Sequence, residues 1–224
     1  MGRLALCLFV SSVIVIVPMH VTSESTNEGV LETFEGYDGA TFPTRWEVRE
    51  KKGEARKIYT IHEEAGNHFL RAHAETVSVQ IGLRYGFSPR PDQRLRWCWR
   101  VNQLPVGGDE RKAETFDSAA GVYVLFDSRL LPRVVKYVWS SSLPPGTRLQ
   151  NPLYWRGKTV VLQSGARRTG RWMQEVVNFY QDYRDLFGRE PDEVLGIALI
   201  TSADATKSSA QADYDDFQLL RVTP

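Results

Sequence analysis

The sequence predicts an all-β fold, a jelly-roll β-sandwich with one short helix. Over residues 77–87 the apolar side chains occupy the odd positions, with polar or small ones between them, and residues 95–101 repeat this alternation. Successive side chains of a strand point to opposite faces, so both segments predict strands with one apolar and one polar face. Short apolar segments separated by glycine and proline continue along the chain, which favours a sandwich over a βαβ fold.

We expect eleven strands in a single domain over residues 31–224, because each apolar segment is short and is bounded by turn-forming residues. No repeat of fixed length and no low-complexity linker divides this region. In chain order the expected strands are residues 45–49, 57–62, 69–74, 76–85, 95–102, 119–126, 134–140, 159–163, 172–177, 194–201 and 214–222.

One helix is expected between the strands at residues 172–177 and 194–201. Apolar side chains at positions 179, 183, 186 and 187 share one helical face. Asn178 is suited to cap the start of this helix, with Gln181 reaching back, and Gly188 is suited to close its end in the left-handed conformation. We expect the helix to pack on the core and to close one open end of the sandwich.

Residues 1–23 have the three parts of a signal peptide. Arg3 supplies a positive charge, residues 4–17 are almost continuously apolar, and residues 21–23 offer small side chains for cleavage. Cleavage after Ser23 predicts export to the periplasm or the extracellular space, with residues 24–30 as a disordered N-terminus. An uncleaved anchor is the alternative, but the apolar run is short for a membrane span. Cys7 lies inside the run, which argues against a lipoprotein.

The 201 residues that remain after cleavage carry 27 basic and 27 acidic side chains. This balance argues against nucleic acid as the main partner. Cys98 is then the one remaining cysteine, so we expect no internal disulfide. We also expect the protein to be a monomer. A thiol that alternates with arginines and has no nearby histidine is expected to be a half-buried structural residue rather than a nucleophile.

The polar strand faces are the first candidate for a ligand site. Arg84 lies on one expected strand and Arg96 and Arg100 on another, so the three share a surface if those strands pair. Asp117 and Glu175 are acids at or in strands that would balance them. One interpretation is a concave groove that hydrogen-bonds sugar hydroxyls or clamps an acidic sugar through arginine. The other is a lattice of salt bridges that simply covers a sheet.

Aromatic side chains are the second candidate, since the chain has six tryptophans and nine tyrosines. Trp139 ends an expected strand, whereas Tyr154 and Trp155 fall in a loop. Rings on loops of a rigid scaffold are suited to stack on the apolar face of a sugar. The three side chains either line a ligand site in this way or cap the core.

Carboxylates near the C-terminus are the third candidate. Asp215 and Asp216, with Asp204 from a nearby loop, offer hard oxygen ligands for a structural calcium ion, although no calcium-loop spacing is present. A glycan hydrolase or lyase would need two carboxylates across a cleft, and Glu175 with Asp117 or Asp216 is the pair available. The histidines are not spaced as zinc ligands.

Six short motifs together resemble the bacterial family called domain of unknown function 3047, over about residues 31–222. They are the W-x-W-R-V strand at 97–101, the D-x-A-A start of a strand at 117–120 followed by Val-Tyr-Val, Tyr-Val-Trp-Ser at 137–140, Asp-Tyr with Phe-Gly at 182–188, the 201–206 segment and Tyr-Asp-Asp-Phe at 214–217. The resemblance implies an exported bacterial protein with a sandwich similar to lectin-like (concanavalin-like) and carbohydrate-binding jelly rolls. It implies no activity.

The chain departs from the family pattern T-D-x-D-x-T at one position. Ser202 replaces the first acid, so a cation that the loop binds in relatives would bind more weakly here. From these observations we expect an exported, non-catalytic protein that binds a carbohydrate or another cell-envelope glycan. A glycan hydrolase or lyase and a periplasmic protein-interaction module are the two alternatives.

Overall fold

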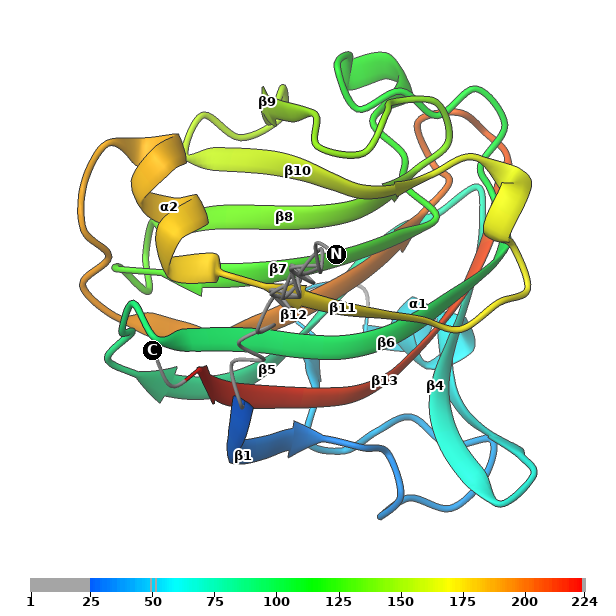
Figure 1. The fold of residues 1–224 in the computed structure, drawn as a ribbon. Helices are drawn as coiled ribbons and strands as arrows, with labels where there is room; N and C mark the ends of the chain where they lie inside the picture. Colours follow the sequence, from blue (N-terminus) through cyan, green and yellow to red (C-terminus); the bar gives the residue numbers. More distant parts are fainter. Residues whose placement is uncertain (1–24, 49, 51, 223–224) are drawn as a thin grey trace, which may run out of the picture.

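The computed structural model describes residues 25–222 apart from residues 49 and 51. The expected signal peptide, with Arg3, Cys7 and Ser23, lies outside the described residues. Two sheets face each other and enclose one main core (Figure 1), which confirms the predicted β-sandwich. Within the described part of the chain, no helix is long and apolar enough to cross a membrane.

Sheet A contains six antiparallel strands in the order β11-β6-β13-β4-β3, with β1 also pairing with β13. The long strand β13 pairs with β6 along one side, and with β4 and then β1 along the other. The strands are β1 (Ser25–Glu32), β3 (Tyr59–Glu64), β4 (Asn67–Glu75), β6 (Gln93–Gln103), β11 (Met173–Val177) and β13 (Ser209–Val222).

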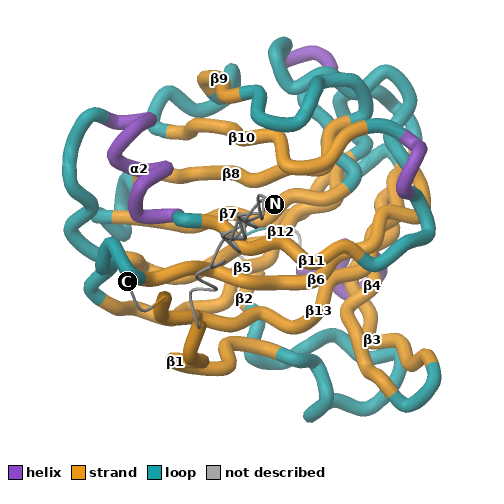
Figure 2. Tube along the Cα trace, in the orientation of Figure 1, coloured by secondary structure: helices purple, strands orange, loops and turns teal. Residues whose placement is uncertain are grey.

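Sheet B contains seven strands in the order β2-β5-β12-β7-β8-β10-β9, and all pair antiparallel except β8 with β10 (Figure 2). The strands are β2 (Glu47–Val48), β5 (Ser78–Phe87), β7 (Ala120–Phe126), β8 (Arg133–Ser140), β9 (Arg148–Gln150), β10 (Gly157–Ser164) and β12 (Val194–Ser202).

Each of the eleven expected strands has a counterpart, and β1 and β9 are the two strands that were not expected. Residues 24–30 were expected to be disordered, but residues from 25 onward form β1 and pair with the C-terminal half of β13. The pairing is made by the backbone, so the polar composition of the segment does not prevent it.

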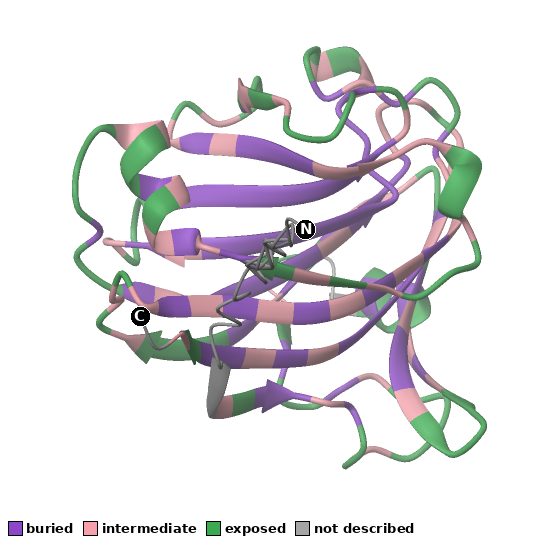
Figure 3. Ribbon diagram, in the orientation of Figure 1, coloured by how far each residue is buried: buried purple, intermediate pink, exposed green. Residues whose placement is uncertain are grey.

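The alternation read from the sequence appears directly in β6. Trp97, Trp99 and Val101 are fully buried between the sheets, whereas Arg96 and Arg100 on the other face are only partly covered (Figure 3). Strand β8 differs because it is buried on both faces: Tyr137 points into the main core, and loops cover its outer side.

Helix α2 (Phe179–Phe187) closes one end of the sandwich, as predicted (Figure 1). Phe179 and Tyr183 enter the main core. The Asn178 side chain accepts a hydrogen bond from the Gln181 backbone amide, and Gly188 ends the helix in the left-handed conformation. The Gln181 side chain turns to Asp185 instead of reaching back.

A second helix, α1 (Lys52–Ile58), was not expected. Its last two residues had been assigned to a strand, so that assignment was wrong for residues 57 and 58. Ala55 and Ile58 are buried in the main core, which explains why a short helix with few apolar residues is held here.

Candidate functional site

The structure separates the three arginines that were expected to share a surface. Arg96 and Arg100 lie on the outer face of sheet A, but Arg84 lies on the outer face of sheet B, where it pairs with Glu47 at 2.8 Å. Strands β5 and β6 are consecutive in the chain but belong to different sheets. Arg96 hydrogen-bonds the side chain of Gln218 in the neighbouring strand. Only Arg100 is therefore part of a larger cluster.

The expected stacking residues also separate. Trp139 is 0% exposed: it packs against Trp99 and donates its ring N–H to the carbonyl of Gly165, so a sugar does not reach it and the expectation is corrected. Tyr154 is half-buried and bonded to the carbonyl of Pro132. Trp155, by contrast, is 72% exposed at the tip of its loop.

A group of side chains around Trp172 on the outer face of sheet A forms a cluster of aromatic rings and paired charges, which we call the Trp172 platform. The indole of Trp172 is 36% exposed and lies over the guanidinium of Arg100, which is 4.7 Å from the ring centre. The ring of the buried Phe69 forms a T-shaped pair with the indole, and the two ring centres are 5.4 Å apart. The platform comprises Glu64, Phe69, Arg71, Arg100, Trp172 and Asp213.

Asp213 holds the platform together. Its carboxylate is fully buried and accepts hydrogen bonds from Arg71 at 2.7 and 3.0 Å, from Arg100 at 2.8 Å and from Asn102 at 2.9 Å. Arg100 also reaches Glu64 at 2.8 Å. Paired, hydrogen-bonded charges of this kind fix the arginine side chains, so the ring above them has a fixed support.

The platform is electrically balanced. The positive charges of Arg71 and Arg100 face the negative charges of Glu64 and Asp213. Burial and the nearby charge of Arg71 lower the pKa of His62, which stacks on Phe69, so this imidazole is neutral at pH 7.

The three carboxylates of the enzyme alternative have different surroundings in the structure. Glu175 points inward, beside the core, and accepts bonds from Trp99 at 3.1 Å and Gln163 at 2.7 Å. Burial raises its pKa. Asp117 is fully buried and accepts bonds from Thr206 at 2.7 Å. Asp216 instead adjoins Cys98 on the outer face of sheet A.

The expected calcium ligands are likewise divided. Asp204 accepts a hydrogen bond from Ser78 at 2.6 Å, whereas Asp215 accepts one from Asn67 at 2.9 Å. Among the residues described by the structure, no three His, Cys, Asp or Glu side chains are grouped as metal ligands.

Cys98 is half-buried, as expected. Burial raises its pKa to about 11, and the charges of Asp216 and Asp215 add to this effect, so the thiol stays protonated at pH 7.

Asp215 should make stability depend on pH. Burial raises its pKa to about 7, with Asp216 adding to the effect. The folded state then binds more protons than the unfolded state between about pH 4 and pH 7, so stability is gained as the pH falls. Relative to Asp215→Asn, we expect the wild type to gain about 1 to 2 kcal/mol from pH 8 to pH 5, discounted for partial solvent access. Urea unfolding at both pH values measures this, and equal gains in both proteins would contradict it.

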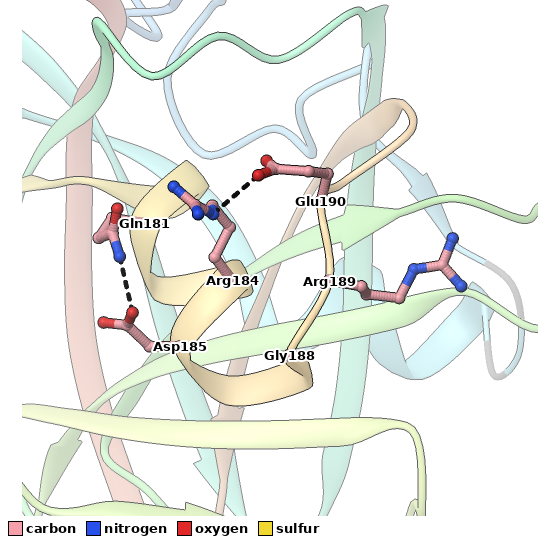
Figure 4. A pocket seen from close by; sticks show the side chains of 6 residues that line it. All are labelled: Gln181, Arg184, Asp185, Gly188, Arg189 and Glu190. Carbon is pink, nitrogen blue, oxygen red and sulfur yellow. Dashed lines mark hydrogen bonds and ion pairs between the residues drawn. The ribbon is translucent and has the colours of Figure 1, made fainter.

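Two hollows of the surface lie around α2. The first is lined by the far end of the helix, where Gln181 bonds Asp185 and Arg184 pairs with Glu190 (Figure 4). The second runs between α2 and β10, where Arg148 bonds Asp182 at 2.6 Å. No aromatic ring lines either hollow, and these polar groups already bond one another, so neither resembles a site for stacking a sugar.

Trp172 is the main residue that the sequence reasoning missed. It stands one residue before β11, opposite Arg100 of β6 when the β11–β6 register is extended by one position. The sequence pattern that could have indicated it is the alternation along residues 172–177, which places positions 172, 174 and 176 on one face of the strand. Without the β11–β6 pairing, neither face of this strand could be identified as the outer one.

The chain has low structural similarity to several solved proteins. TmCBM61 in complex with β-1,4-galactotriose has a TM-score of 0.42 and 10% identity, covering 88% of this chain and 99% of its own. The non-crystalline cellulose specific carbohydrate-binding module CBM28 has a TM-score of 0.43 and 10% identity, with 88% of this chain and 96% of that chain covered. Trichoderma harzianum endoglucanase 3 from family GH12 has a TM-score of 0.41 and 9% identity, with 91% of this chain and 99% of that chain covered.

No curated protein matches the chain. The family described as Protein of unknown function (DUF3047) matches residues 44–218, which is most of the chain and includes Trp172, Arg100 and Asp213. The protein therefore belongs to the DUF3047 family, in agreement with the resemblance read from its motifs.

Proposed function

We propose that this protein binds a glycan without cleaving it, and that the Trp172 platform is the binding surface. The observation that carries the proposal is the partly exposed indole of Trp172, fixed above Arg100 on the outer face of sheet A. A sugar ring presents C–H groups on one face, and an indole is suited to cover them. Because Arg100 and Phe69 support the ring, little side-chain freedom is lost on binding.

Polar groups beside the ring are suited to bind hydroxyls. Gln174 is exposed and lies two positions from Trp172 on the same face. The side chain of Glu64 is 60% exposed, and that of Arg71 is 27% exposed. Together they supply donors and acceptors around one aromatic surface, which is the composition that recognition of a sugar needs.

The charge balance favours a neutral sugar over an acidic one. Asp213 already occupies both Nε and Nη2 of Arg71, and Arg100 is shared between Asp213 and Glu64. The Nε–Nη2 edge of Arg71 is therefore occupied, and the charge of each guanidinium is already compensated by an acid of the protein. Binding is favoured over hydrolysis because the carboxylates of Glu175 and Asp117 are largely buried and already accept hydrogen bonds from neighbouring side chains, whereas a glycosidase needs two carboxylates that face the substrate.

Export of the protein, expected from residues 1–23, would place this surface in the periplasm or outside the cell. The ligand class that follows is a neutral polysaccharide of the cell envelope or of the surroundings.

The test measures the binding of neutral and acidic polysaccharides by affinity electrophoresis and on a glycan array. The wild type is compared with Trp172→Ala. Removing the stacking surface should weaken binding about tenfold, which corresponds to about 1.4 kcal/mol. Trp172→Phe should restore part of the affinity, because it keeps a ring. The bound sugars are then examined for cleavage.

Trp155 offers a matched comparison because it is the other clearly exposed tryptophan. Trp155→Ala should leave glycan affinity unchanged. A loss with Trp155→Ala but not with Trp172→Ala would contradict the platform, and cleaved sugars would contradict the non-catalytic function. Preference for acidic polysaccharides would overturn the neutral-ligand part of the proposal.

A further inference from the structure

Four large apolar side chains stand exposed on two loops of sheet B. Leu130 is 87% exposed and Leu131 54% in the loop between β7 and β8, while Leu153 is 64% and Trp155 72% in the loop between β9 and β10. We call these four residues the loop-tip patch. Single exposed apolar residues are common on protein surfaces, but four on two joined loops form a feature that calls for a partner.

The two loops are bound to each other rather than independent. The Tyr154 hydroxyl donates to the carbonyl of Pro132 at 2.6 Å, and the Val134 amide donates to the carbonyl of Arg156 at 3.0 Å. Asn151 orders the second loop by accepting from the amides of Leu153 and Tyr154. The patch is therefore presented by a braced pair of loops.

The charges next to the patch are positive. Arg129 is exposed beside Leu130, and neither Arg129 nor Arg156 has a carboxylate partner among the described residues. The guanidinium of Arg156 lies 5.3 Å from the ring centre of Trp155. The ammonium of Lys158 bonds the neutral side chain of Gln150 and lies 5.9 Å from the ring centre of Phe187.

Two of the nearby acids are already paired, and the side chain of a third, Glu193, is directed towards Gly86. Asp127 pairs with Arg133 at 2.8 Å, and it also accepts the hydroxyl of Tyr183. In the adjoining segment before β12, Asp192 pairs with Arg189. Three positive side chains, Arg129, Arg156 and Lys158, thus adjoin the loop-tip patch without a carboxylate partner among the residues that the structure describes.

From this arrangement we propose that the loop-tip patch docks on an anionic lipid bilayer. The leucines and the indole would enter the interfacial region, and Arg129, Arg156 and Lys158 would contact the negative head groups. Tryptophan and arginine are suited to this boundary because each combines an apolar body with a polar end. A protein partner is less favoured, since four side chains on projecting tips offer much less area than the roughly 800 Å² per partner of a stable interface.

The test is co-sedimentation of the exported protein with vesicles, its N-terminus first read by mass spectrometry. We expect binding to vesicles that contain phosphatidylglycerol, weaker binding in high salt, and much weaker binding to pure phosphatidylcholine. Leu130→Ser and Trp155→Ala should each reduce binding at least tenfold. Val106→Ser is the matched control, because Val106 is 77% exposed on another loop, and it should bind as the wild type does.

A second readout detects insertion directly. Brominated lipids quench only tryptophans that enter the bilayer, so quenching seen in the wild type should disappear in Trp155→Phe while binding persists. Equal binding to both lipids, no binding, or quenching that survives in Trp155→Phe would overturn the proposal. A dimer that Trp155→Ala dissociates would assign the patch to a second copy of the chain and would also overturn it.

Discussion

Replacing Asp213 with alanine is expected to lower the free energy of unfolding by about 3 to 5 kcal/mol. The carboxylate is fully buried and is bonded by Arg71, Arg100 and Asn102. Its loss would leave the guanidinium of Arg100, whose side chain is only 11% exposed, with Glu64 as its remaining ionic partner. Urea unfolding of the variant and the wild type at pH 7 measures the difference.

Two further variants distinguish the charge from the space that it fills. Asp213→Asn keeps the size but not the charge, so it should cost nearly as much as alanine. Glu47→Ala removes the exposed pair with Arg84, whose side chain is 74% exposed, and should cost less than about 1 kcal/mol. If Asp213→Ala also costs less than 1 kcal/mol, the network does not hold the platform, and Trp172 loses the support proposed for it.

The strands of the core could be read from the sequence because alternation reports burial directly. Trp97 and Trp99 alternate with Arg96 and Arg100, and their faces are as expected. The two short strands that were missed carry no such signal. Strand β1 is held by backbone pairing with β13, and β9 is a three-residue edge strand beside β10.

The site could be predicted only in part, because it depends on which strands pair. Alternation shows that Arg84 and Arg100 point away from the core, but it does not show that their strands lie in opposite sheets. Trp139 could have been placed correctly, since it shares parity with the buried Tyr137 in β8. Its position at a strand end obscured that signal.

Lys136 is the clearest case in which alternation along a strand predicts the wrong exposure for a side chain. It alternates with the buried Val135 and Tyr137, a pattern that predicts a solvent-facing lysine, yet it is 1% exposed. The segment before β7 covers it with Phe116, whose ring centre is 4.4 Å from the ammonium. Such cover comes from residues distant in sequence and leaves no mark in the local pattern.

Lys136 and Glu110 are expected to be strongly coupled in stability. The Lys136 ammonium donates to Ser118 at 3.2 Å, and Ser118 donates to the fully buried Glu110 at 3.0 Å. Lys136→Met leaves Glu110 buried without this cation, and Glu110→Gln leaves Lys136 with Asp117 as its remaining nearby acid. Each variant should therefore cost about 3 kcal/mol. The double variant should cost at least about 1 kcal/mol less than the sum of the two. Additive costs would show that the charges act independently.

The pH dependence gives this coupling a second signature. Burial lowers the pKa of Lys136 to about 8, although Glu110 and Asp117 oppose the shift. The unfolded lysine keeps its proton to about pH 10.4, so between these values the unfolded state binds more protons and stability rises with pH. Between pH 8 and pH 9.5 the wild type should gain about 1.5 kcal/mol relative to Lys136→Met, a comparison that cancels the opposing ionisation of Cys98. A gain of the same size in both proteins would mean that Lys136 stays protonated over this range, because the charges of Glu110 and Asp117 outweigh the effect of burial.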